Sequence, residues 1–320
     1  MTDAGGWHGI WSARGLAARL LWPLSLLYGA VLALRLWLYR TGWLRRVKLP
    51  VPVLVVGNVI VGGAGKTPVT IELALQLQSR GWRVGILSRG YGRTSEAITL
   101  VSPHSDPAQV GDEPVLMHSR TGLPVMVGRD RVQAAHALLQ AHPEVNLLIC
   151  DDGMQHLRLW HDAALCVFDP RRTANGWLLP AGPLREPWPL KLSAPHVWSL
   201  SSEDPPWSGA WPVVRTLSDQ ARNGHGQSVH LSELPHPIHA LAGIAQPQRF
   251  FTALRHAGVN LEQTRALPDH APLNDWQPDT DGTWLCTEKD AVKLWGHLPQ
   301  VWAVPLLVTL PPDLIAQIDQ

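Results

Sequence analysis

The chain has 320 residues, of which 45% are hydrophobic and 17% charged, and its mean hydropathy is −0.03. This composition excludes a disordered chain and a polytopic membrane protein, although it allows a single membrane span. Lys and Arg number 27 and Asp and Glu 26, so the net charge of +1 gives no reason to expect nucleic-acid binding. The three cysteines each lie in an apolar run, which predicts buried, reduced thiols in a cytosolic domain: Cys150, Cys166 and Cys286.

An apolar segment begins near the N-terminus. It has no charged residue from Leu20 to Leu34, and if Arg35 is tolerated it continues to Tyr39. About twenty residues are roughly enough to cross a hydrocarbon core. A basic segment follows, with Arg40, Arg45, Arg46 and Lys48, in the place where a signal peptide would need a cleavage site. We therefore expect an N-terminal membrane helix with the rest of the chain in the cytoplasm. The alternative is an amphipathic helix that lies in the membrane interface.

A glycine-rich loop comes next. The run Val51–Val56 predicts a buried parallel strand, and Val69, Leu73 and Leu77 recur at helical spacing after the sequence NVIVGGAGKT. A strand, a glycine loop and a helix form the context of a P-loop, whose amides surround phosphate oxygens. Lys66 is expected to reach the β- and γ-phosphates and Thr67 to bind Mg²⁺. Ile60 stands where the usual pattern has its first glycine.

Acidic pairs provide candidate partners for the loop. Asp151 and Asp152 follow the apolar run Asn146–Cys150, and adjacent carboxylates at a strand end favour a bound cation, Mg²⁺ here. Asp112 and Glu113 stand at an expected helix start, where capping and catalysis are equally consistent with the spacing. From spacing alone, His270 in a late loop is no more than a polar surface residue.

The order of patterns predicts the organisation of the chain. Residues 1–48 form the anchor and its basic flank, 49–215 a doubly wound α/β domain, and 216–320 a second, smaller α/β domain. The composition of Ser201–Pro212 and Asn223–Gln227 is typical of linkers. In the second domain we expect strands at 238–241, 283–287 and near 301–308, and a helix over 248–256.

These segments together resemble one known family. The N-terminal anchor is followed in order by VGNVIVGGAGKTP, ILSRGYGR, VGDEP, DDGMQH, LLPAGPLRE, PDH and TEKDAVKL, between about residues 17 and 294. The chain is similar in this to the tetraacyldisaccharide 4′-kinases, whose loop also lacks the first glycine. The resemblance implies a P-loop NTPase-like kinase domain with a smaller C-terminal α/β domain. It also implies that ATP and a lipid head group meet in the cleft between them.

The resemblance also implies roles for individual residues. Asp112 would be the general base, working with His270, and Glu113, Asp151 and Asp152 would be metal- or phosphate-side acids, with Thr67 also on the metal. ATP would be bound by Ile60, Val61, Gly62, Gly63, Ala64, Gly65, Lys66 and Thr67. Contacts to the head group or to phosphate would come from Tyr91, Arg131, Gln155, His156, Arg185 and Glu186, although Arg129 could replace Arg131. The TEKDAVKL segment is expected to be structural.

The implied reaction moves the γ-phosphoryl group of ATP to the 4′-hydroxyl of an acylated glucosamine disaccharide 1-phosphate in lipid A biosynthesis. Mg²⁺ is the implied metal and the lipid disaccharide the substrate, with an anionic membrane surface as a further partner and no nucleic acid or evident protein partner. The implied location is the inner membrane, with the catalytic domains facing the cytoplasm. The alternatives are a membrane-attached P-loop NTPase switch and a nucleotide-stabilised membrane scaffold.

Overall fold

The computed structural model describes residues 4–189, 196–202 and 207–320. The chain divides into two compact units, which are described separately. The first contains Met1–Lys66 and Asn146–Pro212, and the second Thr67–Val145 and Val213–Gln320. The unit boundary after Pro212 lies close to the predicted domain boundary at 215. The units also change after Lys66 and after Val145, both inside the predicted domain 49–215. The predicted domains therefore stay a prediction.

The first unit begins with two helices, α1 (Ala4–Ser12) and α2 (Leu16–Arg40). The predicted apolar segment is therefore helical, and the helix continues through Pro23. By length and composition alone, this helix is long and apolar enough to cross a membrane. Large apolar side chains on α2 are exposed, among them Leu16, Leu20, Leu27 and Leu34.

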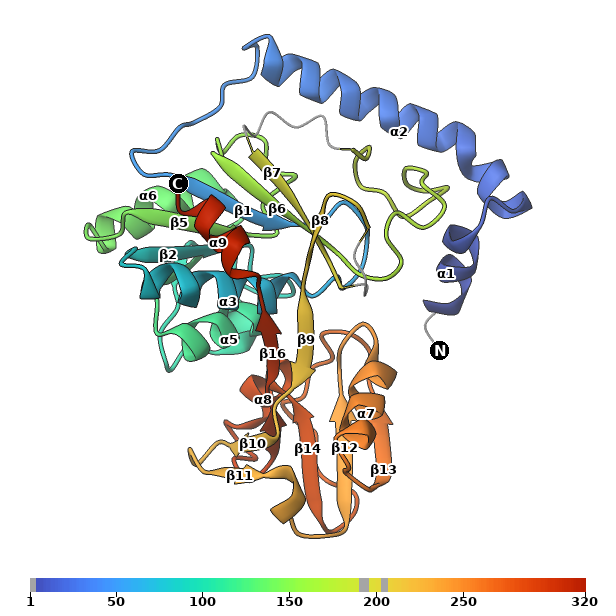
Figure 1. Cartoon of the computed structure of the whole chain (residues 1–320), viewed down its shortest axis with the longest axis vertical. Coiled ribbons are helices and arrows are strands. Elements are labelled where there is room, and N and C mark those ends of the chain that lie inside the picture. The colour runs from blue at the N-terminus through green and yellow to red at the C-terminus, as the bar shows by residue number, and fades with distance from the viewer. Residues whose placement is uncertain (1–3, 190–195, 203–206) are drawn as a thin grey trace. The chain divides into compact units, whose positions relative to one another are not determined.

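A parallel sheet forms the centre of the first unit. Its strands are β1 (Val53–Gly57), β5 (Leu147–Asp151), β6 (Ala163–Phe168), β7 (His196–Ser201) and β8 (Ala210–Pro212). They lie in the order β5-β1-β6-β7-β8, and each neighbouring pair is parallel (Figure 1). Every residue of β1, β5 and β6 is buried, as expected for strands covered on both faces.

One of the predicted linkers is wrong in part. The segment Ser201–Pro212 contains β8, which pairs with β7 through Ser199–Ala210 and Ser201–Pro212. Pro212 is the last residue of that strand, where its missing N–H removes no bond from the centre of a sheet. Residues 203–206 lie outside the described residues.

The second unit begins with the segment that follows the glycine loop. Its elements are α3 (Lys66–Ser79), whose first residue belongs to the first unit, β2 (Val84–Ser88), β3 (Thr99–Leu100), α4 (Pro107–Val110), α5 (Asp112–Thr121), β4 (Val125–Val127) and α6 (Arg131–Ala141). Strand β4 lies between β3 and β2 and is parallel to β2. Helices α5 and α6 both contact β4.

The rest of the second unit is built on another sheet. Its elements in chain order are β9 (Val214–Leu217), β10 (Gln220–Asn223), β11 (Ser228–His230), the 3-10 helix η1 (Leu231–Glu233), β12 (Ile238–Ala242), α7 (Pro247–His256), β13 (Leu261–Ala266), β14 (Thr283–Thr287), α8 (Glu288–Leu294), β15 (Trp302–Val304), β16 (Leu306–Thr309) and α9 (Pro312–Ile318). The sheet order is β11-β10-β15-β14-β12-β13, while β16 pairs with β9. The predicted helix over 248–256 and strands at 238–241 and 283–287 are confirmed.

Two details of this sheet differ from the sequence prediction. The strand expected near 301–308 is divided at Pro305 into β15 and β16, which pair in different sheets. The segment Asn223–Gln227 is the turn of the β10–β11 hairpin, and not a linker. The Asn223 side chain accepts hydrogen bonds from the amides of His225 and Gln227, which fixes the turn.

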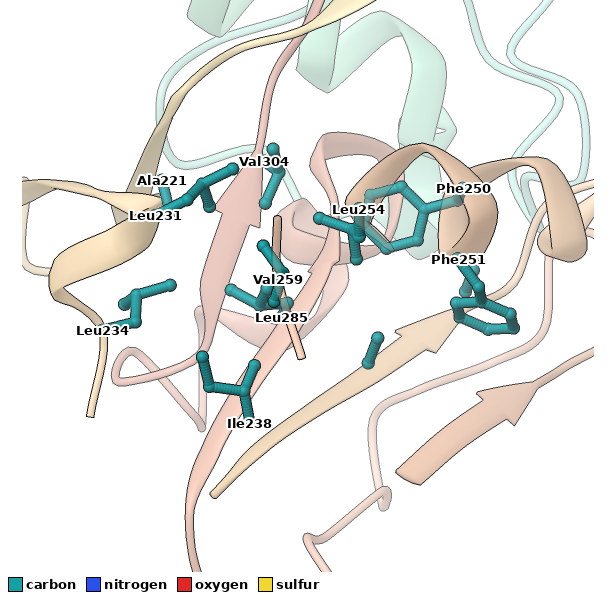
Figure 2. Packing of buried hydrophobic residues seen from close by; sticks show 12 residues of the cluster. Ala221, Leu231, Leu234, Ile238, Phe250, Phe251, Leu254, Val259, Leu285 and Val304 are labelled. Atoms are coloured by element: carbon teal, nitrogen blue, oxygen red, sulfur yellow. The ribbon is translucent and has the colours of Figure 1, made fainter. Parts of the chain in front are cut away.

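An apolar cluster holds α7 on the sheet of the second unit. Phe250 and Leu254 of α7 belong to one buried cluster with Leu285 of β14 and Val304 of β15 (Figure 2). Phe251 and Leu254 are fully buried. A side chain of this size contributes about 1.5–3 kcal/mol when it is buried. The cluster therefore gives the second unit a hydrophobic core of its own.

Candidate active site

The glycine loop connects β1 to α3. Gly62 and Gly65 have φ values of 103° and 70°, in the left-handed region that glycine adopts without strain. Ile60 is fully buried and forms an isolated bridge with Leu184, while the amide of Val61 donates to the carbonyl of Pro183 over 2.9 Å. The residue that replaces the first glycine therefore anchors the loop to the segment that contains Arg185.

Lys66 lies at the end of this loop, beside Asp152. Its Nζ is 3.2 Å from Asn58 Oδ1 and 3.4 Å from Asp152 Oδ1. Arg185 Nη1 is 3.3 Å from the same Asp152 oxygen, so two cations share one carboxylate. Burial raises the pKa of Asp152, but Lys66 and Arg185 outweigh it and the pKa is below its usual value. Asp152 also has a φ of 48°, which is uncommon for a residue other than glycine.

The other candidate metal ligands lie at element ends. Asp151 is the last residue of β5 and is 2% exposed, and Thr67 is buried in the first turn of α3. Within the described part of the chain, no group of three or more His, Cys, Asp or Glu side chains could hold a metal ion. The predicted Mg²⁺ site stays a prediction.

Gln155 and Glu186 bind each other. Gln155 Nε2 donates to Glu186 Oε1 over 2.5 Å and to the carbonyl of Asn58 over 3.1 Å. Burial raises the pKa of Glu186 to about 7. His156 is half-buried in the turn after β5, where its amide donates to the carbonyl of Gly153. Gln155 and Glu186 therefore lie beside the start of the glycine loop, and His156 belongs to the same unit.

Arg171 is a candidate that the sequence analysis missed. Its Nε donates to Asp169 Oδ2 over 2.8 Å, and Asp169 is fully buried. A Cβ added to Gly62 would lie 3.4 Å from both terminal nitrogens of Arg171, so the guanidinium lies against the glycine loop. Ile60 and Arg171 also line a cavity of about 340 Å³. The sequence FDPRR at the end of β6 could have indicated this residue. Parallel strands β1 and β6 end at the same edge of their sheet, so residues that follow β6 lie near the glycine loop that follows β1.

A second cluster, in the second unit, contains Asp112 and His270. His270 Nδ1 lies 3.1 Å from Asp112 Oδ2, and Asp112 is 5% exposed in the first turn of α5. Burial raises the pKa of Asp112, but the hydrogen bond with His270 and the charge of Lys289 outweigh it, so the pKa is below its usual value. The structure therefore brings together the two residues that the family resemblance pairs, which lie 158 positions apart.

Tyr91 belongs to this second cluster. Its ring centroid lies 4.9 Å from that of His270, and the side chain is 63% exposed. The backbones of Gly90 and Gly111 approach closely, because a Cβ on Gly111 would lie 3.0 Å from the Cα of Gly90. This approach places the loop that contains Tyr91 beside the start of α5.

Arg131 is one of the two arginines that the resemblance suggests as a head-group or phosphate contact. It is 3% exposed at the start of α6, and its Nη1 donates to the carbonyl of Gly128 over 2.8 Å. Arg129 has an exposed guanidinium that pairs with Glu96 over 3.4 Å. Glu113, at the start of α5, lies 3.4 Å from Lys289.

The described cysteines are all free and buried, as predicted.

The chain is similar to known proteins along almost its whole length. Residues 17–320 match the model of the family described as tetraacyldisaccharide-1-P 4′-kinase, LpxK. A protein named tetraacyldisaccharide 4′-kinase from Acidovorax sp. (strain JS42) is 51% identical over 317 residues, which cover 98% of this chain and 93% of that protein. The protein of the same name from Delftia acidovorans is 46% identical over 322 residues, covering 99% and 94%.

A solved structure agrees with these relatives. The crystal structure described as the "apo" form of LpxK from Aquifex aeolicus in complex with ATP has a TM-score of 0.82 and 30% sequence identity, and the match covers 95% of this chain and 98% of that one. Both the fold and the sequence therefore agree over almost the entire chain. The chain belongs to the tetraacyldisaccharide 4′-kinase family.

Proposed function

We propose that this protein transfers the γ-phosphoryl group of ATP to the 4′-hydroxyl of a tetraacyldisaccharide 1-phosphate, a step of lipid A biosynthesis. Family membership over residues 17–320 supports this reaction. The observation that carries the proposal is the pair formed by Asp112 and His270, because a hydrolytic switch has no need of a buried carboxylate that accepts a proton from an alcohol.

The glycine loop is the proposed site of ATP. Its positive-φ glycines leave room for phosphate oxygens beside the backbone amides, and Lys66 supplies a cation at the end of the loop. Arg185 and Arg171 supply further positive charge near Lys66 and Gly62 respectively. Phosphoryl transfer requires mainly positioning and neutralisation of charge, which these residues provide.

Asp112 is the proposed general base. The carboxylate takes the proton of the 4′-hydroxyl while that oxygen forms its bond to the γ-phosphorus and the bond to the leaving ADP oxygen breaks. Its low pKa keeps Asp112 ionised at neutral pH, and His270 orients it through the 3.1 Å contact. Tyr91 lies over His270 with an exposed face, which suits a contact with the sugar.

Thr67, Asp151 and Asp152 are the proposed Mg²⁺ ligands. A hydroxyl and two carboxylates are the hard oxygen donors that Mg²⁺ prefers, so these residues fit the ion. When bound, Mg²⁺ neutralises charge that develops on the phosphate oxygens. Lys66 and Arg185 hold the carboxylate of Asp152 in place near the glycine loop.

The remaining proposed contacts concern the head group. Gln155, Arg185 and Glu186 lie next to the glycine loop, and His156 lies in the turn after β5. All four side chains suit polar contacts with the substrate. For the arginine of the VGRDR segment, the exposed guanidinium of Arg129 is the better candidate, because that of Arg131 is turned to the backbone. We assign Arg131 to the support of α6.

Helix α2 is proposed to lie in the interface of the inner membrane, on the cytoplasmic side, and not to cross it. Ser25 Oγ donates to the carbonyl of Leu178, Tyr28 Oη to that of Arg185, and Arg35 to that of Gln155. Together with buried Ala18, these contacts extend over about 26 Å of helix at 1.5 Å per residue. The backbone carbonyls that contact α2 along this length cannot lie in the hydrocarbon core of a bilayer. Too little of the helix remains outside these contacts to cross that core.

An acceptor series tests this function. The purified protein in mixed micelles is given ATP and either the disaccharide 1-phosphate or its 4′-deoxy analogue, and ADP release is measured. We expect release with the natural acceptor and background release with the analogue. Equal release with both lipids, or without lipid, would contradict the kinase assignment and favour an NTPase switch.

A further inference from the structure

The TEKDAVKL segment forms the end of β14 and helix α8, and its polar side chains are all engaged. The Thr287 hydroxyl donates to Asp290 Oδ2 over 2.7 Å at the start of the helix. Glu288 accepts two hydrogen bonds from Arg120 Nη1, of 2.7 and 2.8 Å, which join α8 to α5. The two lysines of the helix extend in a different direction, toward Asp112 and His270.

Lys289 contacts His270 on the side away from Asp112. Its Nζ lies 2.9 Å from His270 Nε2, 3.0 Å from Asp269 Oδ1 and 3.4 Å from Glu113 Oε1. Burial lowers the pKa of Lys289, but the surrounding carboxylates outweigh it and the pKa is above its usual value. The side chain is therefore an ammonium ion, which can only donate hydrogen bonds.

A donor at Nε2 determines which nitrogen of His270 carries the proton. When Lys289 donates to Nε2, the neutral ring has its hydrogen on Nδ1, and that hydrogen faces the carboxylate of Asp112. The opposite tautomer would turn the Nδ1 lone pair toward Asp112 Oδ2 and would place the Nε2 hydrogen against an ammonium group. The contact with Lys289 therefore favours the tautomer that binds Asp112.

Lys293, one turn further along α8, contacts Asp112 directly. Its Nζ lies 3.5 Å from Asp112 Oδ2, 3.5 Å from Asp290 Oδ1 and 3.0 Å from the carbonyl of Ala271. The side chain is 9% exposed. One oxygen of Asp112 thus faces both His270 and Lys293, and the lysine also holds the chain directly after His270.

Asp290 fixes the backbone of the loop that contains His270. Its Oδ2 accepts a hydrogen bond from the amide of Gly243 over 2.9 Å, and the carbonyl of Gly243 accepts one from the amide of His270 over 3.2 Å. His270 has a φ of 57°, a conformation that a residue other than glycine adopts at a cost. The α8 helix therefore supports both the backbone and the side chain of His270.

We propose that Lys289 is a positioning residue for phosphoryl transfer, which sets the tautomer of His270 so that Nδ1–H holds Asp112 in its reactive orientation. Lys293 assists by holding Asp112 and the chain after His270. This inference rests on the proposed roles of Asp112 and His270 and assigns a function to the TEKDAVKL segment. It predicts a loss in kcat without a loss in ATP binding, because the lysines of α8 act on the acceptor's base.

The test compares Lys289→Met with a matched control on the same helix. Glu288→Gln removes charge from the Arg120 ion pair, which joins α8 to α5 without contact to His270 or Asp112. For Lys289→Met we expect kcat to fall about 10- to 100-fold, as for other residues that orient a functional group, with KM for ATP unchanged. For Glu288→Gln we expect a lower Tm and a kcat within about twofold of the wild type.

A spectroscopic measurement reports the tautomer directly. In protein labelled with ¹⁵N-histidine, the His270 signals are identified by their loss in His270→Asn, and their shifts show which ring nitrogen carries hydrogen. We expect Nδ1–H in the wild type and in Glu288→Gln, and Nε2–H or a mixture in Lys289→Met. An unchanged tautomer in Lys289→Met, or a loss of kcat that follows Tm equally in both variants, would overturn the inference.

Asp112→Asn and His270→Asn distinguish a failure of the proposed base from a failure of the positioning role of Lys289. If both lose activity while Lys289→Met keeps it, the role of Lys289 is wrong and the proposed base stands. If Asp112→Asn is fully active, the proposed base itself is wrong.

Discussion

Two buried carboxyl groups of this protein have pKa values displaced in opposite directions. Asp112 has a hydrogen bond with His270 and lies near two lysines, so its pKa is low although burial opposes this. Glu186 is equally enclosed, but its main partner is the neutral amide of Gln155, so burial prevails and its pKa rises to about 7. Neighbouring charges therefore decide that one acid is ionised at neutral pH and the other is half-protonated.

Replacement of Asp112 tests the base. Asp112→Asn keeps an oxygen that accepts the hydrogen bond from His270 but cannot take the proton of the acceptor hydroxyl. We expect kcat to fall about 10²- to 10⁴-fold, with ATP affinity close to that of the wild type. Steady-state kinetics and nucleotide titration check this, and full activity would remove Asp112 from the mechanism.

Glu186 predicts a dependence of stability on pH. Its folded pKa of about 7 is above the ordinary value of 4.5, so between these pH values the folded protein keeps a proton that the unfolded chain releases. The free energy of unfolding therefore falls as pH rises from 4.5 to 7, by up to about 1.4 kcal/mol per unit, and the loss is constant above pH 7.

Glu186→Gln removes this titration and keeps an acceptor for Gln155. Urea unfolding of the nucleotide-free protein at several pH values between 5.5 and 7.5 should show a smaller decrease in stability for the variant than for the wild type. Parallel curves for the two proteins would show that Glu186 titrates normally.

Among the elements, α2 has the most unusual surroundings. Ser25 and Tyr28 donate hydrogen bonds to the segment 178–185, and Leu178 Cδ1 would lie 3.0 Å from a Cβ on Gly29. Ala18 of the same helix is buried. Much of the remaining surface is apolar and exposed. This combination favours a helix that lies in the membrane interface with its apolar side in the acyl chains.

Two spin labels on α2 distinguish a lying helix from a spanning one. Leu16 and Leu34 are both exposed, and 18 residues at 100° per residue place them on one face, about 27 Å apart. Labels on Leu16→Cys and Leu34→Cys should have similar immersion depths in vesicles if the helix lies in the interface. The native cysteines are buried, so the labels attach to the introduced ones. Depths that differ by most of the bilayer thickness would show a transmembrane helix.

The basic segment after α2 predicts a charge-dependent contribution. Arg45 and Lys48 are exposed, whereas Arg46 lies over the rings of Tyr39 and Trp160. Arg45→Gln combined with Lys48→Gln should weaken binding to anionic vesicles by about 1 kcal/mol per charge at low salt, with less effect at high salt. Flotation assays at several salt concentrations measure this, and unchanged flotation throughout would exclude the proposed headgroup contact.

For the whole molecule, the sequence predicts best what depends on local order. The strand, loop and helix around Lys66 are contiguous, so their pattern is visible along the chain. The contact between Asp112 and His270 joins residues 158 positions apart, and only the family resemblance indicated it. Lys289 could not be assigned, because its partners are determined by the packing of α8 on α5. Arg171 was missed because its contact with the glycine loop depends on β1 and β6 ending at the same edge of their sheet.

Composition misled the prediction where structure depends on pairing. The proline- and serine-rich segment before residue 213 contains β8, because an edge strand needs hydrogen bonds on one side only and tolerates Pro212. Pro305 divides a continuous apolar run between two sheets, and the run itself does not show which neighbours its halves will find.

The most direct test of the central claim follows the γ-phosphate. The protein in detergent micelles receives ATP labelled at the γ-phosphate, Mg²⁺ and a disaccharide 1-phosphate lipid, beside the variants Lys66→Ala and Asp112→Ala. We predict that the label moves into the lipid with the wild type and that both variants lose this transfer. Label released only as inorganic phosphate, at a rate that does not depend on the lipid, would contradict the account.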